Sequence, residues 1–262
     1  MDMRGRVVVV TGGCSGIGAA LAARMMDEGA QAVVVADLDT KLAPKGTAAR
    51  RCDVSIEREV VDLVRAVEAE HGRIDVFCSN AGVITPGWDL RETEFARWQR
   101  DWGINVMAHA YAAKAVLPGM LARGEGYLLQ TVSAAGMLAS PESVIYTTTK
   151  HAALALAESL AFSYGRFGIR VSALCPMGVK TPLIDDVDPT GGSAGLDGLL
   201  SADAVAEAAI DGMRREAFFI LPHAKVGAYY AKKASGHEKW LKQMEQLQLR
   251  FVAGAAGGVA TP

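Results

Sequence analysis

Short apolar runs alternate with longer amphipathic stretches along most of the chain. Residues 6–11 (RVVVVT) are continuously apolar and β-branched, which is typical of a central parallel strand buried on both faces. Similar runs predict further strands at residues 32–36, 74–78, 127–132, 169–174 and 218–221.

Stretches with helical periodicity separate these strands. They predict helices at residues 17–28, from an N-cap at Ser55, over 92–122 (two helices or one broken helix), at 143–167 and at 201–216. The tail is predicted to be helical over about residues 224–252. One face of it carries a stripe formed by Trp240, Met244, Leu247 and Phe251.

The order of elements predicts one α/β domain spanning residues 1–262, with a C-terminal helical tail. Strands and helices alternating at this spacing favour a doubly wound parallel sheet of the Rossmann-like type, which binds ligands at the carboxyl ends of its strands. Few residues separate Asp37 from Asp53, so any helix between them is short or lost. We expect a mobile loop at residues 183–200, which are rich in Gly and Asp, and a frayed end at residues 253–262.

The composition limits the kinds of partner that the protein is expected to bind. Half of the residues (50%) are hydrophobic. The chain has 27 Lys+Arg and 29 Asp+Glu, so it lacks the excess of positive charge that is typical of proteins that bind nucleic acid. No apolar run reaches the ~18 residues that span a bilayer, and the first strand begins too early for a signal peptide. We expect a cytoplasmic protein without nucleic-acid or membrane partners. The 4 cysteines (14, 52, 78 and 175) form no Cys-x-x-Cys pair, so we expect reduced, mostly buried thiols and no metal.

A glycine-rich segment, residues 11–18 (TGGCSGIG), joins the first predicted strand to the first helix. Its glycines let the backbone approach a ligand closely, and a helix N-terminus offers N–H groups to a pyrophosphate. A structural tight turn is the alternative reading of the pattern alone. The position within a βαβ unit favours a dinucleotide.

Asp37 ends the second predicted strand. A carboxylate there accepts hydrogen bonds from both ribose hydroxyls of NAD and repels the 2′-phosphate of NADP. The glycine loop contains no Lys or Arg that would offset this repulsion, so the sequence favours NAD. A solvated turn residue is the alternative for Asp37, and Lys41 lies near enough in sequence to keep an NADP-preferring carbonyl reductase open.

Tyr146 and Lys150 lie four residues apart in a predicted helix and share a face, and Ser133 ends the strand before it. Using a phenol near pH 7 requires about 4 kcal/mol of differential stabilisation, which one ammonium at ~4 Å can supply. Ser133 is expected to hydrogen-bond the substrate oxygen. Taken alone, such a pair is more often a packed aromatic ring beside a solvated charge.

These motifs together resemble the short-chain dehydrogenase/reductase family, in its compact branch, from residue 6 to about residue 222. They occur in the order typical of that family: residues 11–18, Asp53-Val54, Asn80-Ala81-Gly82, Asn105, Ser133, Tyr146-x-x-x-Lys150 and residues 176–181 (PMGVKT). Two positions depart from the family pattern. Ser79 stands where a second Asn is common, and Met177 separates Pro176 from Gly178.

The resemblance implies an NAD-dependent oxidoreductase that interconverts a secondary alcohol and a ketone. It implies that Tyr146 is the acid/base, that Lys150 lowers its pKa and holds the nicotinamide ribose, and that Ser133 orients the substrate. Asn105 is implied to position a water that relays protons. The implied NAD-binding residues are Gly12, Ser15, Gly16, Ile17, Gly18, Asp37, Asp53, Val54, Asn80, Ala81, Gly82, Tyr146, Lys150, Pro176, Gly178, Val179 and Thr181.

The predicted substrate end of the site is mostly apolar and contains no arginine. It comprises Ser133, Ala135, Met137, Leu138, Tyr146, Met177, Leu183 and Ile184. We therefore expect an apolar, cyclic or steroid-like alcohol or ketone. For the Met and Leu residues, ordinary core packing is the alternative.

The resemblance also implies a homotetramer that pairs through the alanine-rich helices at residues 104–122 and 150–167. The tail stripe is expected to pack on its own domain, with the active site or a neighbouring subunit as alternatives. The histidines, His109, His151, His223 and the other two, lack partners at ligand spacing and receive no role.

The sequence argues against two other functions. A nucleotide-sugar epimerase or dehydratase would need a substrate domain for which the length leaves no room. A dinucleotide-binding regulator without turnover would not need the complete set of Asn105, Ser133, Tyr146 and Lys150.

Overall fold

The structure, a computed structural model, describes residues 1–255 except 187, 189 and 191. Seven strands form one sheet in the order β3-β2-β1-β4-β5-β6-β9, and every neighbouring pair is parallel. Its strands are β1 (Val7–Thr11), β2 (Ala32–Asp37), β3 (Ala48–Arg51), β4 (Val76–Ser79), β5 (Gly126–Thr131), β6 (Ile169–Leu174) and β9 (Phe219–Ile220). The predicted doubly wound, Rossmann-like sheet is confirmed.

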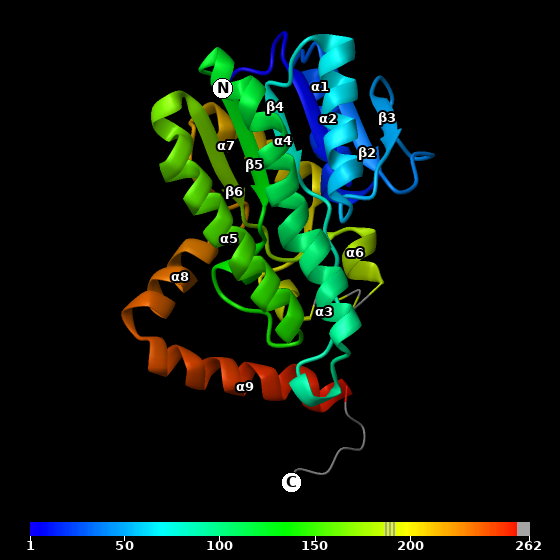
Figure 1. The fold of residues 1–262 in the computed structure, drawn as a ribbon. Helices are drawn as coiled ribbons and strands as arrows, with labels where there is room; N and C mark the ends of the chain where they lie inside the picture. The colour runs from blue at the N-terminus through cyan, green and yellow to red at the C-terminus, as the bar shows by residue number, and fades with distance from the viewer. Residues whose placement is uncertain (187, 189, 191, 256–262) are drawn as a thin grey trace.

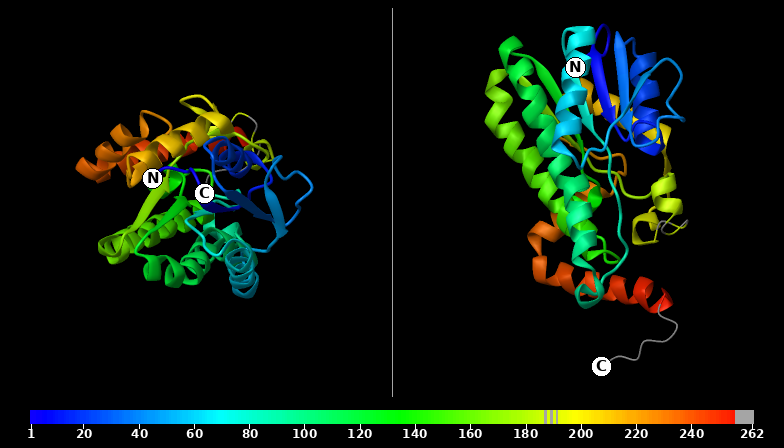
Figure 2. Two further views of the ribbon diagram at one scale, coloured as in Figure 1. Left: turned by 90° about the horizontal axis from the view of Figure 1, so that it is seen from above. Right: turned by 45° about the vertical axis from the view of Figure 1, so that its right-hand side comes forward.

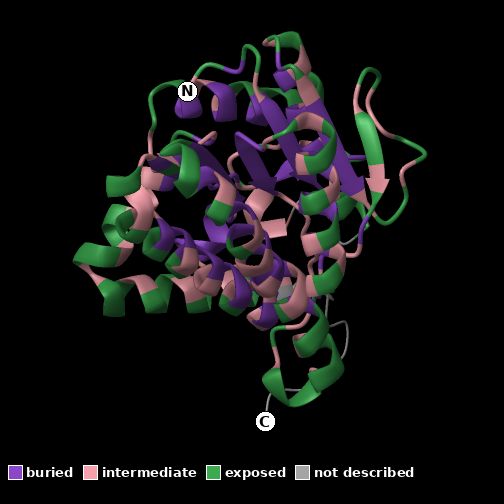
Figure 3. Cartoon of the chain, turned by 45° about the horizontal axis from the view of Figure 1, so that its top comes forward, coloured by how far each residue is buried: buried purple, intermediate pink, exposed green. Residues whose placement is uncertain are grey.

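Helices cover both faces of the sheet (Figures 1 and 2). On one face lie α1 (Gly16–Asp27) and α7 (Ala202–Arg214); on the other lie α2 (Glu57–His71), α4 (Ala108–Arg123) and α5 (Val144–Tyr164). Alternate residues of β1 enter the two cores: Val8 and Val10 join the α1/α7 side, while Val7 and Val9 join the other. This two-sided burial is why the strand is apolar without interruption (Figure 3).

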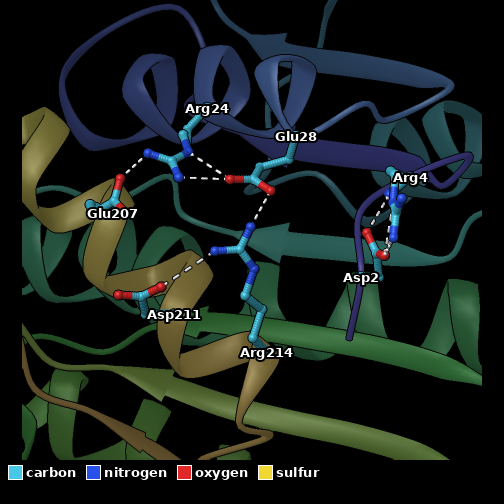
Figure 4. A network of polar contacts seen from close by, with 7 residues as sticks. All are labelled: Asp2, Arg4, Arg24, Glu28, Glu207, Asp211 and Arg214. Carbon is cyan, nitrogen blue, oxygen red and sulfur yellow. Dashed lines mark hydrogen bonds and ion pairs between the residues drawn. The ribbon is translucent and has the colours of Figure 1, made fainter.

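Ion pairs join the exposed edges of α1 and α7 (Figure 4). Arg24 contacts Glu28 and Glu207, and Arg214 contacts Glu28 and Asp211. Such pairs near solvent each contribute little to stability, so the packing of the two apolar helix faces dominates this contact.

Three segments differ in detail from the sequence-based expectations. No helix is found between Asp37 and Asp53, as expected, but the same stretch adds the edge strand β3, whose residues are mostly exposed. Ser55 is not the N-cap of α2. Its N–H and hydroxyl both donate to Asp53 Oδ1 (3.0 and 2.7 Å), and Ile56 caps the helix instead. The predicted frayed end is helical up to Ala255, and its remainder lies outside the described residues.

The broken helix at residues 92–122 resolves into three parts. After a 3-10 turn, η1 (Leu90–Glu92), come α3 (Phe95–Trp102), a π-helical turn η2 (Gly103–Met107) and α4. Shorter elements follow the strands near the carboxyl edge: η3 (Ala134–Gly136), β7 (Val179–Lys180), α6 (Pro182–Asp185), η5 (Gly192–Gly195) and β8 (Leu200–Ser201). One further 3-10 turn, η4 (Gly165–Phe167), joins α5 to the start of β6. Residues 183–200 thus carry short elements, in addition to loop.

The tail forms α8 (Val226–Ser235) and α9 (His237–Ala255), as predicted. None of the described helices is long and apolar enough to cross a bilayer. The 4 cysteines are free and buried, as expected. Within the described residues, no group of three or more His, Cys, Asp or Glu side chains is arranged to hold a metal ion.

Candidate active site

A cleft of about 670 Å³ opens at the carboxyl ends of the strands. It is formed by the segments that follow β1, β2, β4, β5 and β6, together with α9. Most of the predicted site residues line it: Gly12, Ser15, Gly16, Ile17, Asp37, Asp53, Val54, Asn80, Ala81, Gly82, Ser133, Ala135, Leu138, Tyr146, Lys150, Pro176, Met177, Val179, Thr181, Leu183 and Ile184. Four predicted residues do not line it, namely Gly18, Asn105, Met137 and Gly178.

The glycine loop lies tightly against its neighbours. Gly12 has a φ of +61°, and a Cβ there would come within 2.9 Å of the Ala81 Cα. A Cβ on Gly18 would lie 2.0 Å from the Gly12 carbonyl oxygen, so this glycine serves the packing of α1 on the loop. Within the described chain, the side chain of Ser15 makes no capping hydrogen bond. The first N–H groups of α1 therefore remain available to an anionic ligand, which fits a pyrophosphate.

The carboxylate of Asp37 is held at the edge of this loop. Its Oδ2 accepts the Cys14 N–H (3.1 Å) and its Oδ1 accepts the Leu38 N–H (2.8 Å). Lys41, which kept the cofactor preference open, lies near Asp39, with 3.7 Å between Nζ and Oδ2. Asp37 lines the cleft at the end of β2 and Lys41 does not, and a carboxylate at this position suits a ribose diol.

Asn80 connects three strands. Its Nδ2 donates to the Thr11 and Gly12 carbonyls (3.1 and 3.3 Å), and its Oδ1 accepts the Thr131 hydroxyl (3.1 Å). Its side chain therefore fixes the glycine loop against the ends of β4 and β5, which places that loop relative to the residues after β5.

Tyr146 and Lys150 lie on the first turns of α5. The N-cap Ser143 fixes this helix start, since its hydroxyl accepts the Tyr146 N–H (3.0 Å) and donates to the Thr85 carbonyl (2.6 Å). Lys150 Nζ lies 5.7 Å from the centre of the Tyr146 ring and donates to the Thr131 carbonyl at 3.0 Å. The shared helix face predicted from the sequence thus brings the phenol and the ammonium to the same cleft.

Ser133 has a φ of +75°, a left-handed conformation that is rare for a residue with a side chain. Its hydroxyl donates to the Pro176 carbonyl (3.3 Å) and accepts the Ala135 N–H (3.2 Å). These contacts hold the Ser133 side chain between the ends of β5 and β6. Such backbone strain concentrates at functional sites.

Asn105 lies in the π-helical turn η2, behind the cleft. Its Nδ2 donates to the Val83 carbonyl (2.9 Å) and to the Thr149 hydroxyl (3.1 Å), and its Oδ1 accepts the Val83 N–H (3.0 Å). The side chain therefore connects the segment after β4 to α5, next to Lys150. A π-helical turn of this kind is frequent at functional sites.

Burial dominates the ionisation of the two α5 groups. It raises the pKa of Tyr146, although the contact with the Ser133 hydroxyl works in the opposite direction. It lowers the pKa of Lys150 to about 8. The expected lowering of the Tyr146 pKa by Lys150 is therefore not seen in the protein alone, because burial has the largest effect and the group that opposes it is the Ser133 hydroxyl.

The substrate end of the cleft departs from the sequence-based prediction at two places. Met137 is wrong as a lining residue, since it is only 1% exposed and packs in the core under α4 and α5. The tail was expected to pack on the domain, but Trp240, Met244 and Leu247 line the cleft instead. The periodic stripe carried the signal, but the sequence could not show what this apolar face covers.

Three of the 5 histidines, none of which has an assigned role, have a definite partner in the structure. His109 Nδ1 lies 2.6 Å from Gln130 Oε1, His223 Nδ1 accepts the Met177 N–H at 3.1 Å, and His151 contacts the tail. Their partners come from distant parts of the chain, so sequence spacing could not reveal them.

Comparison with known proteins identifies the family. The sequence profile described as short chain dehydrogenase matches residues 6–191. The chain belongs to this family of oxidoreductases. It is 34% identical over 236 residues to 1-deoxy-11-beta-hydroxypentalenate dehydrogenase of Streptomyces exfoliatus, covering 86% of this chain and 85% of that protein.

Two further short-chain dehydrogenase relatives illustrate the range of similarity. The 2,5-dichloro-2,5-cyclohexadiene-1,4-diol dehydrogenase of Sphingobium indicum is 35% identical over 191 residues, which is 70% of this chain and 76% of that one. Among solved structures, a short chain dehydrogenase/reductase from Burkholderia phymatum in complex with NAD superimposes with a TM-score of 0.82 at 28% identity. That match covers 91% of this chain and 96% of the other.

Proposed function

We propose that this short-chain dehydrogenase interconverts an apolar, cyclic secondary alcohol and its ketone, with NAD as the cofactor. The observation that carries the proposal is the position of Ser133, Tyr146 and Lys150 in the same cleft as the glycine loop and Asp37. Acid/base groups and a dinucleotide cradle are both required for this chemistry.

In the direction of oxidation, the Ser133 hydroxyl donates a hydrogen bond to the alcohol oxygen and Tyr146 accepts the alcohol proton. Lys150, with a pKa of about 8, is mostly protonated at pH 7, and its charge favours the phenolate form of Tyr146. Bound NAD would supply the acceptor for the hydride that leaves the carbinol carbon, and the glycine loop, Asp37 and Lys150 are the groups that would hold it. Reduction of a ketone runs through the same groups in reverse, with Tyr146 as the proton donor.

The preference for an apolar, cyclic substrate rests on the lining of the cleft. Met177, Leu183, Ile184 and the α9 residues present hydrophobic side chains there, and among the described lining residues there is no arginine that could bind a carboxylate or phosphate. The Sphingobium relative is likewise named for a cyclic alcohol.

Replacement of the acid/base tests the enzymatic function. Wild-type protein is expected to reduce NAD in the presence of cyclic secondary alcohols, followed by NADH absorbance. Tyr146→Phe should lower kcat by about a hundredfold or more, because it removes the proton acceptor. NAD affinity, measured by calorimetry, should be retained. A wild-type chain that binds NAD but turns over no alcohol or ketone would favour the regulatory alternative.

Replacement of Asp37 tests the cofactor preference. Asp37→Ala removes two acceptor oxygens at the end of β2 and should weaken NAD binding about tenfold. Binding of NADP should improve, because the repulsion of its 2′-phosphate is lost. Titration of both dinucleotides into both proteins measures the change. An unaltered NAD/NADP ratio would refute the role assigned to Asp37.

A further inference from the structure

The helices α8 and α9 lie outside the residues that match the family profile, which ends at residue 191. Figure 1 shows α9 crossing below the lower ends of α3 and α5. Trp240, Met244 and Leu247 recur on one face of α9 and line the cleft. The tail therefore supplies one wall of the substrate end, and the contacts that hold this wall determine its position.

One lysine makes three of the polar contacts between this tail and the catalytic part of the fold. Lys233, near the end of α8, donates through Nζ to the carbonyls of Met137 and Leu138 (both 2.8 Å) and approaches His151 Nε2 at 3.0 Å. An ammonium group has three donors, and these partners use all of them. Among the described residues Lys233 forms no ion pair with a carboxylate, so it binds neutral acceptors only.

The state of His151 follows from its second contact. Its Nδ1 lies 2.9 Å from the Thr147 carbonyl, which can only accept, so Nδ1 carries the hydrogen. Nε2 is then the free acceptor that receives the Lys233 ammonium. Burial, reinforced by the charge of Lys233, lowers the pKa of His151, although the Thr147 carbonyl raises it. A neutral imidazole is what this contact requires.

The three partners of Lys233 belong to the elements that carry the reaction. His151 directly follows Lys150 on α5, while Met137 and Leu138 follow Ser133 through η3. On the other side, Lys233 Nζ lies 4.8 Å from the centre of the Trp240 ring, a cation–π contact with the wall itself. A second contact, from Gln248 Nε2 to the Pro141 carbonyl (2.9 Å), holds the far half of α9.

We propose that Lys233 is a positioning residue that fixes Trp240, Met244 and Leu247 as an apolar wall selecting large cyclic substrates. The proposal rests on the proposed function. A fixed wall contributes binding energy only to a substrate long enough to reach it from Ser133 and Tyr146. A small alcohol occupies the catalytic end alone and does not depend on the wall. Lys233 should therefore control selection by size rather than the chemical step.

Three variants separate this role from a general effect of surface charge. Lys233→Met removes the ammonium and keeps the aliphatic stem, Lys233→Arg keeps charge and donors, and Lys239→Met removes an exposed lysine of α9 as a matched control. The measurements are KM and kcat for a large bicyclic alcohol and for 2-propanol, and hydrogen exchange of the α9 amides without substrate.

Lys233→Met should raise KM for the large alcohol about tenfold relative to KM for 2-propanol, the size expected when charged hydrogen bonds are lost. The kcat should change much less, and the α9 amides should exchange faster. Lys233→Arg should keep both the KM for the large alcohol and the exchange of the α9 amides close to their wild-type values. Lys239→Met should behave as wild type.

Equal changes of KM for both alcohols, or unchanged exchange of α9 in Lys233→Met, would overturn the proposal. The same rise in KM and the same faster exchange of α9 in Lys239→Met would also overturn it. If wild-type protein oxidises no alcohol, the proposed function fails and substrate selection with it. Hydrogen exchange then still decides whether Lys233 anchors α9, so the two failures are distinguishable.

Discussion

Lys150 is only 3% exposed, and burial lowers the pKa of its ammonium group to about 8. An unfolded lysine has a pKa of about 10.4, so below pH 8 the group is protonated in both states and the fold carries the full cost of a buried charge. The cost disappears as pH rises past the unfolded value. A shift of this size corresponds to about 3 kcal/mol at pH 7.

Lys150→Met is therefore expected to stabilise the NAD-free protein at pH 7 while abolishing its turnover. Loss of the bond to the Thr131 carbonyl offsets part of the gain, leaving an increase of about 1–2 kcal/mol in the free energy of unfolding. Urea unfolding at pH 7 and at about pH 10.5 measures it, and at the higher pH the gain should give way to a small loss, because only the missing bond to the Thr131 carbonyl then remains. A variant less stable than wild type at pH 7 would show that the buried charge is not costly.

Ser133 shows what the sequence can and cannot reveal about a residue. Its place at the end of a strand follows from the apolar run before it, and its position among the other motifs indicates a role. The φ of +75° does not follow, because it depends on contacts with Pro176 and Ala135 that form only when β5 and β6 lie side by side.

At the scale of elements, the sequence predicts what local periodicity encodes. The strand β1 is buried on both faces and is recognised by its continuous run of valines, and α5 by its length and its cap. The edge strand β3 (AARR) escapes prediction because its side chains are mostly exposed and carry no apolar alternation. Ser55 is a plausible cap in sequence, but Asp53 competes for its N–H and hydroxyl.

The residues of the cleft likewise divide into those that the sequence predicts and those that it does not. Parallel strands bring their carboxyl ends to one edge, so residues as distant as Gly12, Asp37 and Tyr146 were predicted to meet. The sequence does not predict that α9 forms a wall of this cleft, because an amphipathic stripe identifies an apolar face without identifying what it covers. Lys233 and His151 were missed for a similar reason: their contact joins positions 82 residues apart that no motif connects.

At the scale of the whole molecule, α4 and α5 leave apolar side chains in solvent. Phe162 on α5 is 77% exposed, Phe167 just after it is 46% exposed, and Leu121 on α4 is 36% exposed. These lie in the helices that the family resemblance implies as contacts of a homotetramer. Apolar surface of this kind is typical of a face that another subunit covers.

We expect the protein to be a tetramer of about 110 kDa, four times the chain mass of 27.6 kDa, by light scattering after size exclusion. Phe162→Glu should reduce the assembly to smaller species without unfolding the chain, because the side chain is exposed within the subunit and a buried unpaired carboxylate opposes association. Leu42→Glu is the matched control, since Leu42 is equally exposed (77%) but lies in the loop between β2 and β3. Dissociation by both variants would indicate a nonspecific charge effect, and a wild-type mass of one chain would contradict the tetramer itself.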